Sequence, residues 1–546
     1  MRRPNAKPPE LSSSLNDAAS SMDSASKLHL RASAVAAKST LFSRSSHKSR
    51  LLVIAAAVLV ALSVFAYLIV AARSGRIMKF RIVIDGGSTG TRIHVLRYEV
   101  VGGKALFDFK GGKALWSLRV NPGLSSYAEE PSGAEESLGE LIEFGKGRVP
   151  RGSWSSTEIR LLATAGMRLL DLKEQEEILD SCRKVLRQSG FMFQDNWASV
   201  ISGSDEGKYA WVVANYAMGS LGGDPMETTG IIELGGASAQ VTFVAREPVP
   251  SEFSHSLQFG NYSYNLYSHS FLHFGQNVAH DSLRESLLSG DLNSVTESTQ
   301  NNTLIDPCTP KGYSHDQVLS NLAPGSLSEE KIPANSLQAE GDFIQCRSAA
   351  LAFLQKGNDK CLYQHCQLGS SFVPKLHGKF LATENFFFTS KFFRLSPRAK
   401  LSDLMRAGEQ YCREDWVDLK KKYHPHEDED LLRYCFSSAY IVALLNDGLG
   451  IALDDGRISF TNNVRDIPLD WALGAFILQS NADIAENHLD WTSNIGQNDS
   501  PTLLALIVIF LFFVFTAWSL SKWKKPQLKT IYDLEKGRYI VTRIGK

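Results

Sequence analysis

Two long apolar stretches without a charged residue lie near the ends of this 546-residue chain and limit where a folded domain can form. They cover residues 51–72 and 502–520. About 20 apolar residues in a helix span the roughly 30 Å hydrocarbon layer of a bilayer. A cleaved signal peptide starts closer to the first residue and has a shorter apolar run than 51–72. We therefore expect transmembrane helices at 51–72 and 502–520, with a folded region between them.

The charges beside these stretches predict an orientation in the lipid bilayer. Residues 1–50 carry nine basic and three acidic side chains, and residues 521–546 carry eight and two. Positively charged flanks usually remain cytosolic, so we expect 1–50 to be a disordered cytosolic tail and 521–546 a short basic one. The chain as a whole has 58 basic and 58 acidic side chains, a balance that gives no sign of a nucleic-acid partner.

The cysteines and the glycosylation motifs favour an oxidising compartment for the region between the stretches. All seven cysteines lie there, as expected in the Golgi or another endomembrane lumen, or outside the cell. Asn261 and Asn301 begin sequons, which predict a glycoprotein. Zinc is the alternative for Cys361 and Cys366, but no second close cysteine or histidine pair has ligand spacing. Disulfides are therefore the better interpretation.

One pattern occurs twice: a strand-like segment, a carboxylate, paired glycines and small hydroxyl residues. The first copy contains D-G-G-S-T-G-T at 85–91, and the second contains E-L-G-G-A-S-A at 233–239. Glycines let backbone N–H groups turn toward an anion, and a carboxylate at the strand end can hold a divalent cation against phosphate oxygens. A single copy would fit an ordinary hairpin. Two copies favour two similar lobes that hold one phosphate chain.

The candidate phosphate-binding residues of the two loops are Asp85, Gly86, Gly87, Ser88, Thr89, Gly90, Thr91, Arg92, Gly235, Gly236, Ala237 and Ser238. No G-x-x-x-x-G-K-[ST] string occurs in the chain, which excludes a P-loop nucleotide hydrolase.

Two further polar segments lie between the loops. Thr164 and Arg168 follow an apolar strand, and Arg168 could hold a phosphate oxygen in a bidentate contact or simply be a surface helix arginine. Glu206 stands near the start of an expected helix, where a carboxylate often only complements the helix dipole. If a phosphate lies between the lobes, Glu206 can instead accept a proton from an attacking water.

Five segments in order make the chain resemble the apyrases, the nucleoside triphosphate diphosphohydrolases. They are I-D-G-G-S-T-G-T-R (84–92), A-T-A-G-M-R (163–168), I-S-G-S-D-E-G-K-Y-A-W (201–211), E-L-G-G-A-S-A-Q (233–240) and W-A-L-G-A (471–475). The two apolar stretches are also similar to those of membrane-bound apyrases, and the general style resembles a plant apyrase. The resemblance implies an α/β fold of the actin and sugar-kinase type, with two RNase H-like lobes. We expect lobe I at 78–202 plus 465–490, and lobe II at 203–464.

The resemblance also implies roles for single residues. Glu206 matches the catalytic base, and Thr164, Ser238 and Gln240 match groups that position the nucleophilic water. Asp85 and Glu233 match the two acids that hold Ca²⁺ or Mg²⁺ through waters. The implied activity is hydrolysis of the terminal phosphate of nucleoside tri- and diphosphates, which yields a monophosphate and phosphate.

Glu233 departs from the family pattern, which usually has aspartate there. One extra methylene moves the carboxylate by about 1.5 Å, so cation preference or rate can differ from those of relatives. This departure is the one hint of a nucleotide-binding membrane protein with weak catalysis. An exopolyphosphatase or a sugar kinase of the same superfold would also explain the paired loops, but explains the 201–211 segment less well.

The aromatic and cysteine segments complete the expectations. Phe387 and Phe388 belong to a stretch that resembles the family's aromatic segment and are candidates for stacking on a base, although core packing is commoner. Proximity in the sequence and the family pattern together predict the disulfides Cys308–Cys346, Cys361–Cys366 and Cys412–Cys435, with Cys182 as a buried or inert thiol. The preferred base, the preference between tri- and diphosphates and the oligomeric state are not predicted.

Overall fold

The computed structural model divides into residues 1–74 and 75–546. It describes residues 59–60, 63–65, 77–101, 104–109, 114–289, 304–313, 337–357, 360–363, 366–480, 512–513, 515, 528–533, 535 and 537–543. The expected tail at 1–50 lies outside these residues, as do most of the expected spans at 51–72 and 502–520. Among the described residues, no helix combines the length and the apolar character needed to cross a bilayer. Within 521–546, strands β19 (Leu528–Asp533) and β20 (Arg538–Arg543) pair antiparallel.

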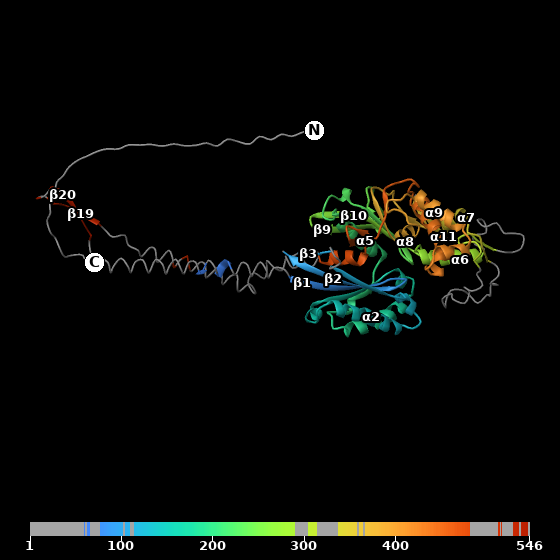
Figure 1. Ribbon diagram of the computed structural model, residues 1–546, viewed down its shortest axis with the longest axis horizontal. Helices are drawn as coiled ribbons and strands as arrows, with labels where there is room; N and C mark the ends of the chain where they lie inside the picture. Colours follow the sequence, from blue (N-terminus) through green and yellow to red (C-terminus); the bar gives the residue numbers. More distant parts are fainter. Residues whose placement is uncertain are drawn as a thin grey trace, which may run out of the picture. The chain divides into compact units, whose positions relative to one another are not determined.

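The first lobe is built on a sheet with the order β3-β2-β1-β5-β6, in which β4 also pairs with β2. The strands are β1 (Ile77–Gly86), β2 (Thr91–Val101), β3 (Lys104–Leu106), β4 (Leu115–Val120), β5 (Glu158–Ala163) and β6 (Ala198–Val200). Alternate residues of β1 face opposite sides of the sheet. Ile82 and Ile84 belong to a core formed with α2 (Gly133–Arg148) and α4 (Leu172–Arg187), whereas Val83 belongs to a different core. Figure 1 shows α2 below this sheet.

The second lobe repeats this arrangement in a sheet with the order β16-β15-β7-β8-β10-β9. Its strands are β7 (Gly230–Leu234), β8 (Ser238–Val244), β9 (Ser254–Phe259), β10 (Tyr262–Leu272), β15 (Phe380–Glu384) and β16 (Ile458–Phe460). In both sheets the first strand in chain order is antiparallel to the second and parallel to the fifth, since β1 pairs with β2 and β5 just as β7 pairs with β8 and β15. The paired loops therefore join equivalent strands of two similar sheets.

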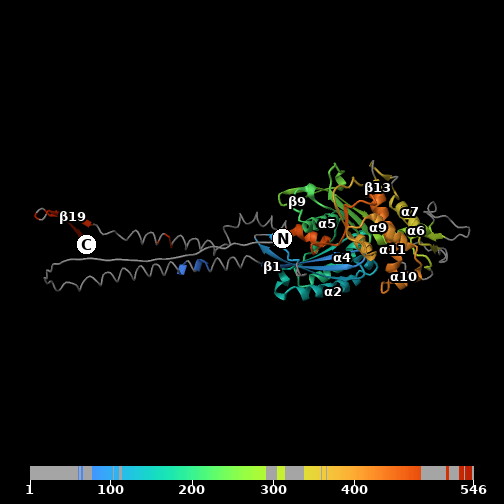
Figure 2. The ribbon, with the colours of Figure 1, turned by 45° about the horizontal axis from the view of Figure 1, so that its top comes forward.

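A group of helices covers the outer part of the second lobe (Figures 1 and 2). They include α6 (Gln276–Leu288), α7 (Phe343–Leu354), α8 (Asn385–Phe392), α9 (Leu401–Cys412), α10 (Trp416–Lys422) and α11 (Asp428–Val442). The three predicted disulfides are confirmed in this lobe: Cys308–Cys346, Cys361–Cys366 and Cys412–Cys435. Cys182, in the first lobe, is a buried free thiol as predicted.

The separate hydrophobic core to which Val83 belongs joins the two lobes. It contains Val83 from the first sheet, Ile231 from the second, and residues of α5 (Gly203–Met218) and of the helical stretch 471–480. In that stretch, the Phe476 ring lies 5.0 Å from the Tyr98 ring of β2. The returning segment thus contacts the first sheet, while the part of 465–490 after residue 480 lies outside the described residues. The exact lobe boundaries stay predictions.

Candidate active site

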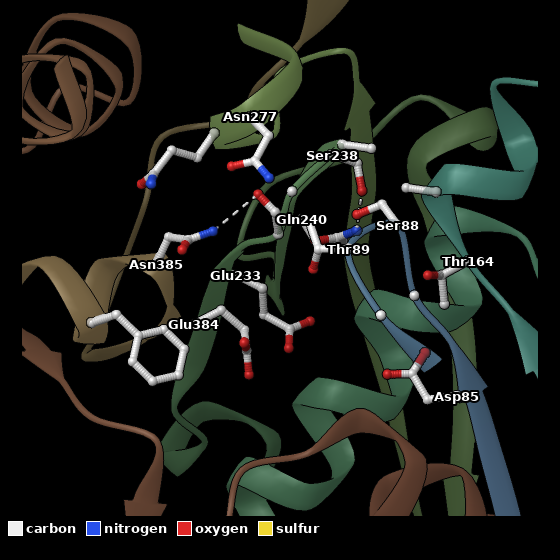
Figure 3. A pocket seen from close by; sticks show the side chains of 18 of the residues that line it. Asp85, Ser88, Thr89, Thr164, Glu233, Ser238, Gln240, Asn277, Glu384 and Asn385 are labelled. Atoms are coloured by element: carbon white, nitrogen blue, oxygen red, sulfur yellow. Dashed lines mark hydrogen bonds between the residues drawn. The ribbon is translucent and has the colours of Figure 1, made fainter. Parts of the chain in front are cut away.

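A cavity of about 440 Å³ is lined by the ends of β1 and β7 and by the loops that follow them (Figure 3). Most of the predicted site residues line it. These are Asp85, Gly87, Ser88, Thr89, Gly90, Arg92, Thr164, Glu206, Glu233, Gly235, Gly236, Ala237, Ser238, Gln240 and Phe388. Of the remaining four, Gly86 and Thr91 form the last β1–β2 pair and do not line the cavity. Their assignment as phosphate contacts stays a prediction.

The first loop is the turn of the β1–β2 hairpin. Asp85 lies opposite Arg92 in the register, so residues 87–90 form the turn. Arg119 of β4 donates to the Thr89 carbonyl oxygen at 2.9 Å and to Thr89 Oγ1 at 2.8 Å. Gly90 allows this approach, since a Cβ at that position would lie 2.4 Å from Arg119 Nε. An arginine that the sequence did not single out thus fixes the tip of the first loop.

The second loop is the turn of the β7–β8 hairpin, and neighbouring amides hold it. The Gly235 N–H donates to the Ser238 carbonyl oxygen at 2.9 Å. The backbone N–H groups of Gln276 and Asn277, at the start of α6, donate to Gly235 O and Gly236 O, each at 2.9 Å. Donors of the protein itself thereby occupy these carbonyl oxygens, which weakens the negative charge that the loop would present to an anion.

The two loops approach each other across the cavity. A Cβ added to Gly236 would lie 2.7 Å from Ser88 Oγ and 2.7 Å from Thr89 Cγ2. Real Cβ atoms essentially never come this close to a neighbour. A side chain at 236 would therefore force Ser88 or Thr89 to shift, so glycine suits the close approach of the two loops.

Glu206 lies in the first turn of α5, which begins after Ser202; the Ser202 side chain accepts from the Asp205 N–H. Burial raises the pKa of the Glu206 carboxyl, and the neighbouring Arg168 opposes that rise. Arg168 Nη2 donates to Glu206 Oε2 at 2.6 Å. Arg168 thus has a carboxylate partner and does not line the cavity, and its predicted phosphate contact stays a prediction.

The groups predicted to position water lie near this carboxylate. Gln240 Nε2 donates to Ser238 Oγ at 2.6 Å, and a hydrogen bond from Gln240 lowers the pKa of Glu206. Thr164 is buried at the edge of the cavity, and its Oγ1 donates to Gly86 O at 3.4 Å. The three polar groups thus line the cavity together with Glu206, and Gln240 is the one shown to bond to its carboxylate.

The two acids at the strand ends are suited to a divalent cation. Burial raises the pKa of the Asp85 carboxyl well above its ordinary value, and the nearby Asp470 carboxylate raises it further. Burial also raises the pKa of the Glu233 carboxyl well above its ordinary value, and the Glu206 carboxylate raises it further. Asp85 Oδ1 and Glu233 Oε2 are buried without a hydrogen-bond partner. In the part of the chain that the structure describes, no three His, Cys, Asp or Glu side chains are placed to hold a metal directly.

Further residues line the cavity that the sequence analysis missed. They are Arg119, Gln276, Asn277, Glu384, Asn385, Thr389, Asp430, Arg433, Tyr434, Ser437, Leu469 and Asp470. Asp470 binds Arg92 and lies 3.3 Å from His94 Nε2. Asp470 directly precedes the W-A-L-G-A segment, and this position could have indicated that it belongs to the site. Glu384 and Asn385 could have been found in the same way, because they directly precede the phenylalanine run.

The two phenylalanines predicted to stack on a base differ in position. Phe388 lines the cavity and is 46% exposed. Phe387 packs against Phe388 at 5.6 Å between ring centroids but is not part of the cavity lining. The structure thus places Phe388 in the cavity lining, and the stacking role of either ring stays a prediction.

Comparison with known proteins decides the family. The model of the GDA1/CD39 (nucleoside phosphatase) family matches residues 73–492. The chain belongs to this family. It is 59% identical over 471 residues to "Probable apyrase 6" of Arabidopsis thaliana, a match that covers 86% of this chain and 85% of that protein. The expected enzyme class is confirmed: this member of the family is a nucleoside phosphatase.

More distant members and one solved structure extend the comparison. The chain is 29% identical over 464 residues to "Ectonucleoside triphosphate diphosphohydrolase 1" of Rattus norvegicus, across 79% of this chain and 86% of that protein. The crystal structure of nucleoside triphosphate hydrolases from Neospora caninum matches with a TM-score of 0.57 at 17% identity, across 78% of this chain and 96% of that one. This likeness confirms the two-lobed α/β fold.

Proposed function

We propose that this chain is an apyrase that removes the terminal phosphate of nucleoside tri- and diphosphates by direct attack of water. One observation carries the proposal: Glu206 lines the same cavity as both glycine loops, and these loops approach within contact distance of each other. A phosphate chain held by both loops lies within reach of one buried carboxylate. The names of the plant and rat relatives support the same substrate class.

Different residues of the cavity would bind phosphate, accept the proton of water and orient that water. The loop N–H groups with Ser88, Thr89 and Ser238 would bind phosphate oxygens, and preorganised donors of this kind stabilise the charge that develops on the transferred group. Glu206 would take the proton of the attacking water, and its raised pKa brings this carboxylate closer to the range of an efficient general base. Gln240, next to it, would orient that water.

Asp85 and Glu233 would hold the cation, Ca²⁺ or Mg²⁺, through waters. When bound, such a cation neutralises phosphate charge and orients the transferred group. The two unpartnered carboxylate oxygens described above would accept hydrogen bonds from its water shell. Because Glu233 is one methylene longer than the usual aspartate, our proposal includes a cation preference that differs from that of relatives.

Phe388 and Tyr434, both in the cavity lining on the second lobe, would stack on the base. Phe387 is left out of this proposal, since it does not line the cavity.

The test is phosphate release by the full chain with Ca²⁺ or Mg²⁺ and a panel of nucleotides. We expect release from nucleoside tri- and diphosphates, and Glu206→Gln to lose at least about 100-fold of it. Glu140→Gln, an exposed site on α2, is the control. Equal activity of Glu206→Gln and wild type would reject the base. Release only from polyphosphate, phosphate transfer to a sugar, or nucleotide binding without turnover would each favour one of the alternatives raised by the sequence.

Our proposal extends to location: an integral membrane glycoprotein with both termini cytosolic and the catalytic region in the Golgi or other endomembrane lumen, or outside the cell. The apolar stretches and the three disulfides support it. Asn261 is exposed in the turn between β9 and β10, where a glycan can be accepted. Glycosidase treatment should shift the mass of the wild type, and Asn261→Gln should reduce that shift; a catalytic region digested by protease added to the cytosolic side would contradict the orientation.

A further inference from the structure

Glu384 brings a third acid to the cation side of the cavity. It is the last residue of β15, which runs parallel to β7 with Thr383 opposite Glu233. Figure 3 shows the Glu384 and Glu233 carboxylates next to each other, with Asp85 facing them from the first lobe. Glu384 lines the cavity together with both of these acids.

The backbone of Glu384 adopts a conformation that favours glycine. Its φ is 57° and its ψ is −121°, a region that side chains rarely enter without strain. Two bonds hold it there: the Glu384 N–H donates to Asn462 Oδ1 at 2.8 Å, and Asn385 Nδ2 donates to Leu234 O at 2.9 Å. A strained residue in a cavity points to a task for its side chain.

The arginines of the site have other partners. Arg168 binds Glu206, Arg92 binds Asp470, and Arg119 donates to Thr89. Glu233 is 5% exposed, and its Oε2 faces the cavity region without a hydrogen-bond partner, as does Asp85 Oδ1. The charges of Arg92 and Arg119 also act on Glu384 and oppose the rise in its pKa that burial causes. Within the described part of the chain, however, neither arginine forms a direct ion pair with Glu384, Glu233 or Asp85, so a ligand that supplies positive charge and hydrogen-bond donors suits these acids. A hydrated divalent cation supplies both.

We propose that Glu384 is a third acidic contact of the divalent cation, made through a cation-bound water from the second lobe, and that it strengthens cation binding. The inference rests on the proposed function for the identity of the ligand. Glu384 is a positioning residue in this scheme, since it contacts the water shell rather than the nucleotide. Two acids, Glu233 and Glu384, would then hold the cation from the second lobe, against Asp85 alone from the first.

Calorimetric titration of the full chain with Ca²⁺ alone and with Mg²⁺ alone, without nucleotide, tests this. We expect Glu384→Gln and Glu384→Gly each to weaken the Kd for the cation by about 10-fold, as is usual for outer contacts of a metal site. Glu247→Gln, at an exposed position of the second lobe, is the matched control and should keep the wild-type Kd. An unchanged Kd in both Glu384 variants would overturn the proposal.

Thermal unfolding of the same samples separates cation positioning from a purely structural role. Glycine relieves the backbone strain, so Glu384→Gly should unfold on the order of 1–2 °C above wild type while it binds the cation less tightly. A Glu384→Gly protein that is less stable and has an unchanged Kd would show that Glu384 serves only the fold. Since no nucleotide is present, these results do not depend on hydrolysis. Full activity of Glu206→Gln would reject the proposed base and leave the cation result standing.

Discussion

The two phosphate loops occupy equivalent places in two similar sheets, yet different side chains surround them. The loop after β1 has Arg92 across from its acid and Arg119 bonded at its tip. The loop after β7 has Gln240 across from its acid and is held by the N–H groups that begin α6. The repeated strand order supplies the backbone turn, while segments outside the repeated motif supply the charge. A repeat within a sequence thus predicts shape better than it predicts electrostatics.

This contrast suggests a division of tasks between the lobes. The first lobe offers guanidinium groups, which bind phosphate oxygens strongly. The second lobe offers neutral amides together with Glu233 and Glu384, which favour the cation, and its cavity-lining arginine, Arg433, is paired with Glu429. The phosphate chain would therefore be held mainly by charge on one side and through its cation on the other.

The largest effect should come from forcing the two loops apart. Gly236→Val places a branched side chain where even a Cβ would meet Ser88 and Thr89 at 2.7 Å. A displacement of about 1 Å at reacting groups can cost on the order of 100-fold in rate, so we expect at least that loss in kcat for phosphate release. Gly139→Ala is the control, because nothing lies within 4 Å of the added Cβ. Near-normal kcat in Gly236→Val would mean that the loops do not bind the same phosphate chain.

Giving each of the two acids the side-chain length of the other tests whether the lobes hold the cation differently. Asp85→Glu pushes a carboxylate into a site bounded by Arg92 and the first loop, and we expect kcat to fall about 10-fold or more. Glu233→Asp shortens a side chain whose neighbour Glu384 remains, and a water can fill the gap, so we expect a change within about 3-fold. Rates measured at saturating Ca²⁺ and Mg²⁺ compare the two. Equal losses would show that both lobes hold the cation in the same way.

The next prediction compares the contribution of a charged donor in the first lobe with that of a neutral donor in the second lobe to nucleotide binding. Arg119→Ala removes charge-assisted bonds and should raise KM for nucleotide about 10-fold. Asn277→Ala removes a neutral side chain from the second lobe and should raise it only about 2-fold. Added salt should weaken nucleotide binding less in Arg119→Ala than in wild type. Should Asn277→Ala cost as much as Arg119→Ala, the proposed division between the lobes would be wrong.

The smallest effect concerns pH. Burial raises the pKa of Glu206, and Arg168 holds that rise in check. Arg168→Met removes the positive charge, so the pKa of Glu206 should rise further and the acidic limb of the kcat profile should move to higher pH. The rate well above that limb should change less than the rate below it. Arg187→Met, which breaks an exposed ion pair with Asp195, should leave the profile unmoved. A profile that falls uniformly in Arg168→Met would assign Arg168 a different role.

Sequence reasoning reached the parts of the site that lie in continuous motifs at strand ends. Asp85, Glu206 and Glu233 are such residues, and all three line one cavity. The role of Arg168 could not be predicted, because its bond to Glu206 joins residues 38 positions apart on different helices. Thr91 is buried and does not line the cavity, which could not be predicted because a motif does not show which residues of a strand end turn into the core.

The residues that were missed come from segments without a recognisable motif. Glu384 reaches the site only because β15 pairs with β7, and Arg119 only because β4 pairs with β2. Pairing between strands so distant in the sequence is not encoded by local periodicity. The choice between Phe387 and Phe388 depended in the same way on which face α8 turns to the second lobe.

The distance between the two lobes at the cavity depends on the volume of the side chains packed in the core that the lobes share. Val83, Ile231 and residues of α5 meet the helical stretch 471–480 there, and Gly474 approaches α5 so closely that a Cβ would lie 1.8 Å from the Tyr209 carbonyl oxygen. A bulkier residue at such a point would tilt one sheet against the other and leave every substrate contact chemically intact. Relatives with the same substrate contacts would therefore differ in kcat where they differ in interior residues that do not contact the nucleotide.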